Sequence, residues 1–237
     1  MIKLVTFDLD DTLWAVSPVV IRANQLSWQW MQEHTPAFTE RYSMEDLFEG
    51  SELRRQMLDR YPEINHSMTL IRLRTLEFGY QQVGYSLEES QHWANLAFEF
   101  FHQHRHDVQP YEAVRDMLTA LKSAGYMVGA LSNGNAEIGR TPLAEWFDFQ
   151  YNADNVGTAK PHPLMFEKAL EHAGVTAAEA VHIGDHPIND VKAAKEMGFK
   201  TIWVNPENLN YPHEIEADLI VEELADLPAA IAEFASV

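Results

Sequence analysis

The sequence predicts an α/β fold: a Rossmann-like, doubly wound parallel sheet with an inserted four-helix cap. From residue 110 onward, short apolar stretches alternate with helical stretches, which is typical of a parallel sheet covered by helices on both faces. Residues 16–105 are helical in pattern throughout, although an apolar strand at 4–7 precedes them. Because that strand belongs to the same sheet, we expect a core domain of residues 1–15 and 106–237, interrupted by a helical cap domain of residues 16–105.

The spacing of apolar residues and the positions of proline and glycine predict where each helix and strand lies. The first strand is the apolar run Leu4-Val5-Thr6-Phe7. Apolar residues at helical spacing, bounded by Pro36, Pro62 and Gly84, predict cap helices at 18–34, 44–60, 65–79 and 87–102. The same reasoning predicts core helices at 110–125, 163–174 and 189–198, a terminal alanine-rich helix, and core strands at 126–131, 149–151, 180–183, 201–204 and 219–221.

Composition limits the function. The 237 residues carry a formal net charge of −19, which argues against binding to nucleic acid or to an anionic membrane, since both need a positive surface. There is no cysteine, which excludes thiol nucleophiles, disulfides and thiolate metal sites and fits a reducing compartment. The apolar run before Asp8 is too short for a signal-peptide core, and no apolar run reaches membrane-spanning length. We therefore expect a cytoplasmic protein.

Carboxylates follow the first strand directly. Asp8 and Asp10 are two residues apart on extended chain and so point the same way, at the strand end where open α/β sheets bind ligands. Two converging like charges need a cation. The alternative is a helix N-terminus with Asp10, Asp11 or Thr12 as its cap.

Three further loops follow predicted strands or precede helices. They are Ser132-Asn133-Gly134, Lys160-Pro161, and Gly184-Asp185 with Asn189-Asp190. Taken singly, these are a polar turn, a surface lysine and a helix cap. Taken together, Asp8 and Asp185 supply the hard oxygen ligands that Mg²⁺ prefers. Asp8 could then attack phosphorus, and Asp10 could serve as general acid and base.

In order and spacing, these loops resemble the four motifs of the haloacid dehalogenase-like (HAD) hydrolase superfamily, with residues 16–105 in the place of its type 1 cap. The resemblance implies that Asp8 is the nucleophile and a metal ligand. It makes Asp10 the general acid and base and a metal ligand through its carbonyl, with Thr12 orienting it. The remaining implied roles are phosphate binding by Ser132, Asn133 and Lys160, metal ligation by Asp185, and support of the metal shell or of Lys160 by Asn189 and Asp190.

The resemblance also narrows the reaction. Dehalogenases of the superfamily lack a carboxylate at the position of Asp10, and phosphonate-cleaving members use a cap lysine, which residues 15–105 do not contain. We expect a Mg²⁺-dependent phosphatase that acts on a small-molecule phosphate ester through a phosphoaspartyl intermediate, as a monomer or homodimer. A sugar phosphomutase and a non-catalytic phosphate-binding regulatory protein are the alternatives.

Cap residues suggest a substrate class. Segments 7–14, 62–74 and 203–208 are similar to those of bacterial HAD phosphatases active on flavin mononucleotide and related riboflavin-pathway phosphates. Arg54, Arg55, Arg72 and Arg74 are candidates to bind the anionic or planar part of the substrate, because guanidinium groups suit bidentate and stacking contacts. Arg74 could equally lie along a packed helix edge. Trp14 either faces a flavin ring or packs the hinge.

Overall fold

The computed structural model describes residues 1–206 and 216–234. Glu207 and Asn208, part of the segment 203–208 named above, lie outside the described residues. The chain divides into two compact units. The sheet unit consists of Met1–Ala15 and Val108–Val237, and the helical unit of Val16–Asp107.

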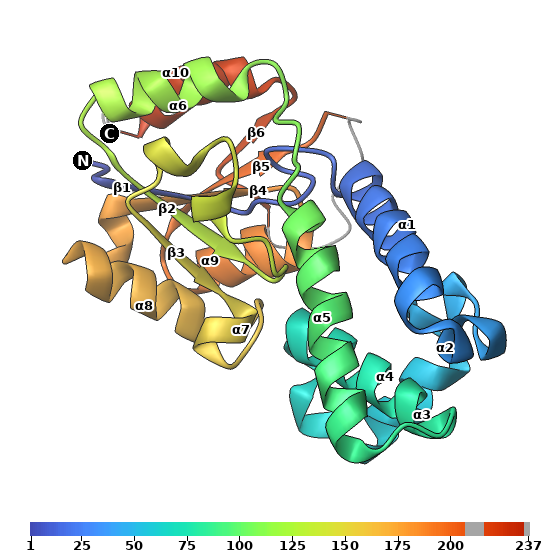
Figure 1. Ribbon diagram of the computed structural model, residues 1–237. Coiled ribbons are helices and arrows are strands. Elements are labelled where there is room, and N and C mark those ends of the chain that lie inside the picture. Colours follow the sequence, from blue (N-terminus) through green and yellow to red (C-terminus); the bar gives the residue numbers. More distant parts are fainter. Residues whose placement is uncertain (207–215, 235–237) are drawn as a thin grey trace. The chain divides into compact units, whose positions relative to one another are not determined.

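In the described part of the sheet unit, six parallel strands form one sheet in the order β3-β2-β1-β4-β5-β6 (Figure 1). Their bounds are β1 (Leu4–Phe7), β2 (Met127–Ser132), β3 (Phe149–Asn152), β4 (Ala180–Gly184), β5 (Lys200–Val204) and β6 (Leu219–Val221). Strands β1, β2 and β4 are almost entirely buried, because a parallel sheet is covered on both faces and selects continuous apolar runs. The predicted doubly wound α/β fold is confirmed.

Helices cover both faces of this sheet. Figure 1 shows α6 (Val114–Ser123) and α10 (Leu227–Glu233) on one face, and α8 (Leu164–Ala173) and α9 (Ala193–Glu196) on the other. A short helix, α7 (Ala153–Val156), follows β3. The single helix expected at 189–198 is divided in the structure. A π-helical segment, Pro187–Lys192, comes first, and the α-helix α9 follows it. Such π-helical segments are rare and often lie at functional sites.

The chain order reverses at β1, which pairs with β2 on one side and with β4 on the other. Phe7 is in register with Ala130 and with Ile183, so the loops after β1, β2 and β4 emerge side by side at one edge of the sheet. Ligands of open α/β sheets bind at such a switch point. This topology positions the candidate site.

The helical unit contains five α-helices: α1 (Val16–His34), α2 (Pro36–Arg41), α3 (Glu52–Arg60), α4 (Met68–Gln82) and α5 (Leu87–Arg105). Two predictions were wrong in detail. Pro36 begins a further short helix instead of only ending the first, since proline fits the first helical turn. The stretch 44–60 is broken, because Gly50 has a φ of 82° and Ser51 caps α3 by accepting the N–H of Arg54.

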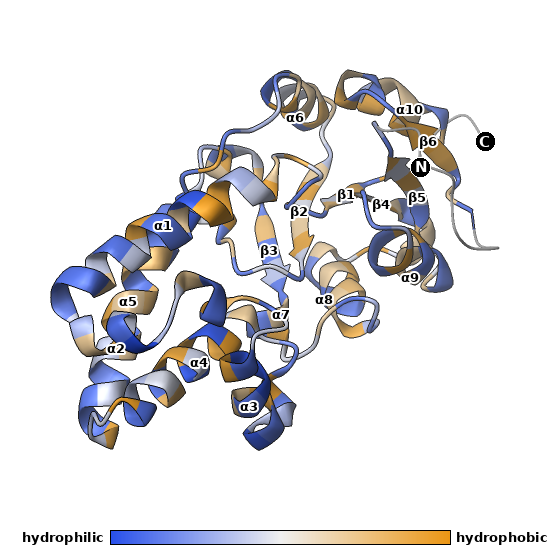
Figure 2. Ribbon diagram, turned by 90° about the vertical axis from the view of Figure 1, so that its right-hand side faces the viewer, coloured by the Kyte–Doolittle hydropathy of each residue, from blue (hydrophilic) through white to orange (hydrophobic). Residues whose placement is uncertain are grey.

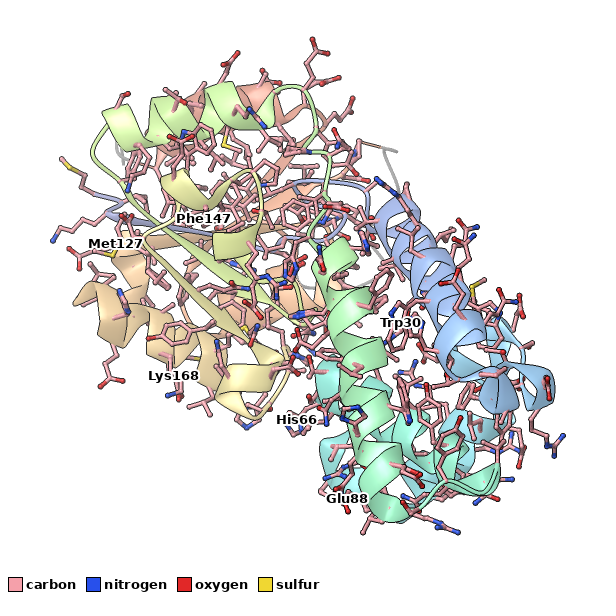
Figure 3. The ribbon with its side chains drawn as sticks, in the orientation of Figure 1. Trp30, His66, Glu88, Met127, Phe147 and Lys168 are labelled. Carbon is pink, nitrogen blue, oxygen red and sulfur yellow. The ribbon has the colours of Figure 1, made fainter. Side chains whose placement is uncertain are left out.

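Buried aromatic and aliphatic side chains, among them Met31, Phe38 and Tyr80, fill the interior of the helical unit, and partly buried rings pack against them. Trp30, labelled in Figure 3, stacks on His34 of the same helix at 4.4 Å between ring centroids and on Phe100 of α5 at 5.9 Å. Figure 2 shows α3 as a strongly hydrophilic helix, and only Leu53 and Met57 of it are buried. Among the described residues, no helix has both the length and the apolar character needed to cross a membrane.

Candidate active site

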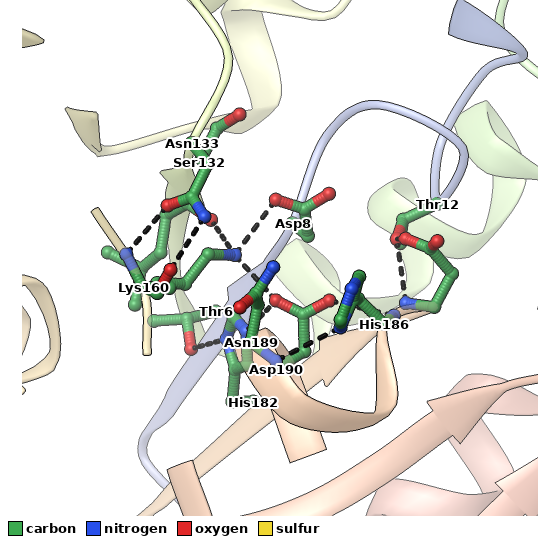
Figure 4. Close-up of polar contacts among 12 residues, drawn as sticks. Thr6, Asp8, Thr12, Ser132, Asn133, Lys160, His182, His186, Asn189 and Asp190 are labelled. Atoms are coloured by element: carbon green, nitrogen blue, oxygen red, sulfur yellow. Dashed lines mark hydrogen bonds and ion pairs between the residues drawn. The ribbon is translucent and has the colours of Figure 1, made fainter. Parts of the chain in front are cut away.

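Asp8 lies immediately after β1, where its N–H donates to the carbonyl oxygen of Ile183 in β4 at 2.9 Å. Its Oδ1 accepts a hydrogen bond from Nζ of Lys160 at 2.8 Å (Figure 4). The Lys160 side chain is only 1% exposed. A buried ammonium needs several acceptors, and Lys160 has three: Asp8, the carbonyl of Leu131 at 2.6 Å and Oδ1 of Asp190 at 2.6 Å.

Asn133 fixes the backbone that carries Lys160. Its Oδ1 accepts the N–H of Lys160 at 2.7 Å and its Nδ2 donates to the Lys160 carbonyl at 2.8 Å. This reciprocal pair joins the loop after β2 to the lysine loop. Ser132 precedes Asn133, is 1% exposed, and accepts the N–H of Gly134 at 3.0 Å. The two phosphate-binding candidates of this loop therefore lie beside the lysine.

The carboxylate of Asp190 has several hydrogen-bond donors around it. Besides Lys160, its Oδ1 is 3.2 Å from Nε2 of His182, and its Oδ2 accepts the N–H of His186 at 3.0 Å. Burial raises the pKa of the Asp190 carboxyl, but the charge of Lys160 and the contact with His182 outweigh it and hold that pKa far below its usual range. Gly184 permits this packing, because a Cβ there would lie 2.3 Å from Cγ of Asp190.

Asp10 is oriented by a tryptophan. Residues 9–14 form a tight turn in which Asp11 has a φ of 60° and its N–H donates to the Trp14 carbonyl at 2.8 Å. The turn brings Nε1 of Trp14 to 2.9 Å from Oδ1 of Asp10. The Trp14 side chain is 0% exposed. Of the two predicted roles for Trp14, the buried ring fits packing, with a hydrogen bond to Asp10 added.

Thr12 contacts Asp185. Its hydroxyl donates to Oδ1 of Asp185 at 2.8 Å and accepts the N–H of Asp185 at 3.1 Å. The resemblance assigned Thr12 to orienting Asp10, whereas the structure places its hydroxyl on the carboxylate of the β4 loop. Trp203 holds the other side of this loop, since its Nε1 donates to the Asp185 carbonyl at 2.7 Å.

Asn189 lies one residue before Asp190 in the π-helical segment. Its N–H donates to Nδ1 of His186 at 3.1 Å. The same imidazole nitrogen accepts the N–H of Ile188 at 3.1 Å, so His186 caps the segment. The cap keeps the backbone around Asp190 in place.

Electrostatics favour a cation at this edge of the sheet. Burial raises the pKa of Asp8 well above its usual range, with Lys160 opposing this shift and the charges of Asp190 and Asp185 adding to it. Burial and the Asp190 charge likewise raise the pKa of Asp185. Asp8, Asp185 and Asp190 each offer an oxygen within 4.8 Å of the others'. A hard divalent cation would offset this repulsion, so the residues fit Mg²⁺.

The haloacid dehalogenase-like hydrolase family model matches residues 2–198, most of the chain. The chain belongs to this family. The predicted membership, and with it the class of hydrolases, is confirmed.

Relatives and solved structures agree with a HAD-like hydrolase. The chain is 33% identical over 207 residues to the 5-amino-6-(5-phospho-D-ribitylamino)uracil phosphatase YigB of Escherichia coli (strain K12), covering 87% of this chain and 85% of the relative. It is 30% identical to a glyceraldehyde 3-phosphate phosphatase of Pyrococcus furiosus, over 95% and 88% of the two chains. The crystal structure of a 2-haloacid dehalogenase from Pseudomonas syringae pv. Tomato DC3000 is 36% identical, covers 99% of this chain and 100% of its own, and has a TM-score of 0.92.

The four arginine candidates of this HAD-like hydrolase lie in the helical unit and differ in their partners. Arg55 is exposed and forms an ion pair with Glu52. Nη1 of Arg74 forms an ion pair with Glu77 at 2.5 Å, and its guanidinium lies 5.8 Å from the ring centroid of Tyr61. Arg54 and Arg72 have no ion pair within the described part of the chain, and in each the buried Nε has no hydrogen-bond partner there.

Sequence reasoning missed Thr6 and His182, which lie behind the motifs of the HAD-like hydrolase. They are register partners on β1 and β4, and Oγ1 of Thr6 is 2.9 Å from Nδ1 of His182. Burial lowers the pKa of His182, so its imidazole is neutral near pH 7. The available signal was a polar residue inside each of two apolar strands, each shortly before a motif aspartate.

Proposed function

We propose that this protein is a Mg²⁺-dependent phosphatase that hydrolyses a small phosphate monoester through a phosphoaspartyl intermediate on Asp8. The observation that supports it most directly is the pair of carboxylates after β1, which have different partners. Asp8 contacts a buried lysine, and Asp10 contacts the Trp14 indole. The contact with lysine suits Asp8 as a nucleophile, and the contact with the indole suits Asp10 as a general acid and base.

In the first step, a carboxylate oxygen of Asp8 attacks phosphorus, and the bond from phosphorus to the alcohol oxygen breaks. Asp10 in its protonated form donates its proton to that oxygen as the alcohol leaves. Lys160, 2.8 Å from the nucleophile, together with the Ser132 and Asn133 loop, stabilises the negative charge on the phosphoryl oxygens.

In the second step, Asp10, now ionised, accepts a proton from water as the water oxygen attacks the phosphorus of the aspartyl phosphate. The bond between phosphorus and the Asp8 oxygen breaks and inorganic phosphate is released, which restores both carboxylates. Asp8 and Asp185, with the Asp10 carbonyl, would hold Mg²⁺, with Asn189 and Asp190 supporting its surroundings. Bound there, Mg²⁺ would offset the repulsion between the aspartates and the phosphate.

The substrate class follows from the relatives. One of them acts on a phosphorylated riboflavin-pathway pyrimidine and another on glyceraldehyde 3-phosphate, both small phosphate monoesters. We infer that the substrate here is flavin mononucleotide, a related riboflavin-pathway phosphate or a sugar phosphate. We include residues 16–105 as a cap domain, a cytoplasmic location and a monomeric or homodimeric assembly in the proposal.

Dehalogenation is the reaction named for the Pseudomonas syringae structure. A halide leaves without a proton, so a dehalogenase needs no acid at the position of Asp10. The hydrogen bond from Trp14 to Asp10 therefore favours cleavage of an ester oxygen. A sugar phosphomutase would retain both carboxylates, and a phosphate-binding regulatory protein would retain Lys160 without turnover.

The test is release of inorganic phosphate from a metabolite panel that includes flavin mononucleotide, with Mg²⁺ or with chelator, for the native protein and Asp8→Asn. We expect release that requires both Mg²⁺ and Asp8. Chloroacetate, assayed for halide release, and sugar phosphates, assayed for isomer formation, are included. Halide release or isomer formation without phosphate release would overturn the proposal, as would binding of phosphate esters with no turnover.

A further inference from the structure

Two arginines of the helical unit have no ion-pair partner among the described residues. Arg54 lies on α3 and Arg72 on α4, and these two helices pack together. Within the described residues, Nε of each is buried without a hydrogen-bond partner, and no carboxylate forms an ion pair with either guanidinium. Buried donors are rarely left unpaired in folded proteins, so a missing acceptor is the natural explanation.

Arg72 is held in place by an aromatic ring. Its guanidinium carbon lies 3.5 Å from the ring centroid of Phe101 on α5, and Phe101 is 4% exposed. This contact fixes the plane of the guanidinium but gives its N–H groups no acceptor. Burial, and then the positive charge of Arg54, lower the pKa of Arg72 to about 9. The positive charges of Arg72 and of the half-buried Arg54 therefore repel each other in the free protein.

Only a weak negative charge acts on Arg54. Burial lowers the pKa of Arg54, and only the charge of Glu49, an exposed residue, opposes this shift. Two other arginines of the helical unit do have ion-pair partners. Arg55 is exposed and paired with Glu52 on its own helix, and Arg74 is paired with Glu77. Arg54 and Arg72 therefore differ from these two arginines in having no carboxylate within ion-pair distance among the described residues.

We propose that Arg54 and Arg72 form a binding site for an anionic group, a phosphate, sulfate or carboxylate, supplied by a ligand. An oxyanion would accept N–H groups of the two guanidiniums and neutralise both charges, and a guanidinium already oriented against Phe101 suits bidentate contact. A neutral carbonyl would satisfy donors but leave the charge repulsion. The site belongs to the helical unit alone and needs no metal.

The first test is calorimetric titration of sodium sulfate into the full-length protein at constant ionic strength, with chelator present. Without a metal, the aspartates around Lys160 repel anions, so the sheet unit contributes little. We expect one saturable site in the native protein. Affinity should fall at least about tenfold in Arg54→Gln and in Arg72→Gln, because each loses charged hydrogen bonds.

Arg55→Gln is the matched control, since it removes an exposed arginine next to Arg54 on the same helix. It should bind sulfate like the native protein. Arg72→Lys keeps the charge but loses the planar fork, and should have intermediate affinity. Far-ultraviolet circular dichroism checks that each variant is folded. Absence of saturable sulfate binding in the native protein, or equal affinity in native protein and Arg72→Gln, would overturn the proposal.

A second test, which rests on the proposed phosphatase activity, identifies the source of the anion. It compares kcat/KM on 3-phosphoglycerate with that on glycerol 3-phosphate, two esters that differ by a carboxylate in place of a hydroxymethyl group. If the anion is part of the substrate, Arg72→Gln should lower the ratio about tenfold. If the ratio is unchanged while sulfate binding is lost, the site holds a free anion. A protein without phosphatase activity would refute the proposed function but leave the titration result intact.

Discussion

Lys160 in the sheet unit and Arg72 in the helical unit are both buried cations, yet their pKa values shift in opposite directions. Burial lowers the pKa of Lys160, but Asp190 and Asp8 outweigh it and raise that pKa to about 12. Burial and the charge of Arg54 lower the pKa of Arg72 to about 9. The sheet unit thus carries its own counter-charges, whereas the helical unit lacks them. Only Lys160 has its carboxylate partners in the protein without a ligand.

The largest expected effect comes from removing the paired cation. Lys160→Met should lower the free energy of unfolding by about 3–5 kcal/mol, because it leaves Asp8 and Asp190 buried without their partner. Turnover should fall by about 1000-fold. Urea denaturation and steady-state kinetics measure the two effects. Native-like stability would mean that the three-way contact around Lys160 contributes nothing to the fold.

Removing the Trp14 hydrogen bond should have an intermediate effect. Trp14→Phe keeps an aromatic ring but takes the donor away from Asp10, so kcat should fall about tenfold while KM stays the same. If Asp10 protonates the leaving oxygen as proposed, the loss should be larger for an alkyl phosphate than for 4-nitrophenyl phosphate, whose alcohol leaves readily. Equal losses on both esters would show that Trp14 acts through packing alone.

Removing the unpaired cation should affect stability little. Arg72→Met takes away a desolvated charge along with its contact to Phe101, so the free energy of unfolding should stay within about 1 kcal/mol of the native value or rise. Both Arg72→Met and Lys160→Met are measured by urea denaturation. The difference between their losses of unfolding free energy then shows how much an ion-pair partner contributes. A loss as large as that of Lys160→Met would mean that Arg72 has a structural partner.

The smallest expected effect concerns Asp148, which accepts bonds from Lys122 Nζ at 2.7 Å and from the N–H of Val128 at 2.7 Å. Burial raises the pKa of Asp148, but these bonds and the Lys122 charge outweigh it and lower that pKa. A carboxyl group with a lowered folded-state pKa stabilises the protein above its usual pKa, and this stabilisation is lost as the pH falls through the lowered value.

Asp148→Asn should therefore cost about 0.5 kcal/mol at pH 7, a modest figure because the pair is partly exposed. The difference from native should disappear once the pH falls below the lowered pKa of Asp148. Thermal unfolding of both proteins across this range measures it. A difference that persists unchanged in acid would point to packing at Asp148 instead of charge.

The sequence predicted the fold and the meeting of the motifs because both depend on periodic patterns. Apolar runs at Leu4–Phe7 and Ala180–Gly184 indicate parallel strands, and the strand ends bring Asp8 and Asp185 to one edge. The chemical roles of these residues remain predictions. Pro36 and Gly50 show the limit of this reasoning, since each both ends one segment and permits another, and the choice depends on tertiary packing.

Partners within the site could not be predicted in the same way. The bond from Trp14 to Asp10 depends on the tight turn at 9–14, and the contact between Thr6 and His182 depends on strand register. Neither is visible in residue spacing. The pairing of Arg74 with Glu77 follows from a separation of three residues on a helix, whereas the isolation of Arg72 emerges only when three helices are packed.

The buried imidazole of His182 gives this enzyme an internal spectroscopic reporter. It lies between the Thr6 hydroxyl and the Asp190 carboxylate, and Asp190 in turn contacts Lys160. A proton on Nε2 would exchange slowly with solvent and give a resolved magnetic resonance signal. Its chemical shift should move whenever the charge around Lys160 changes. Binding of a ligand near Lys160 can therefore be followed from the other side of the Asp190 carboxylate, with no label beside Asp8.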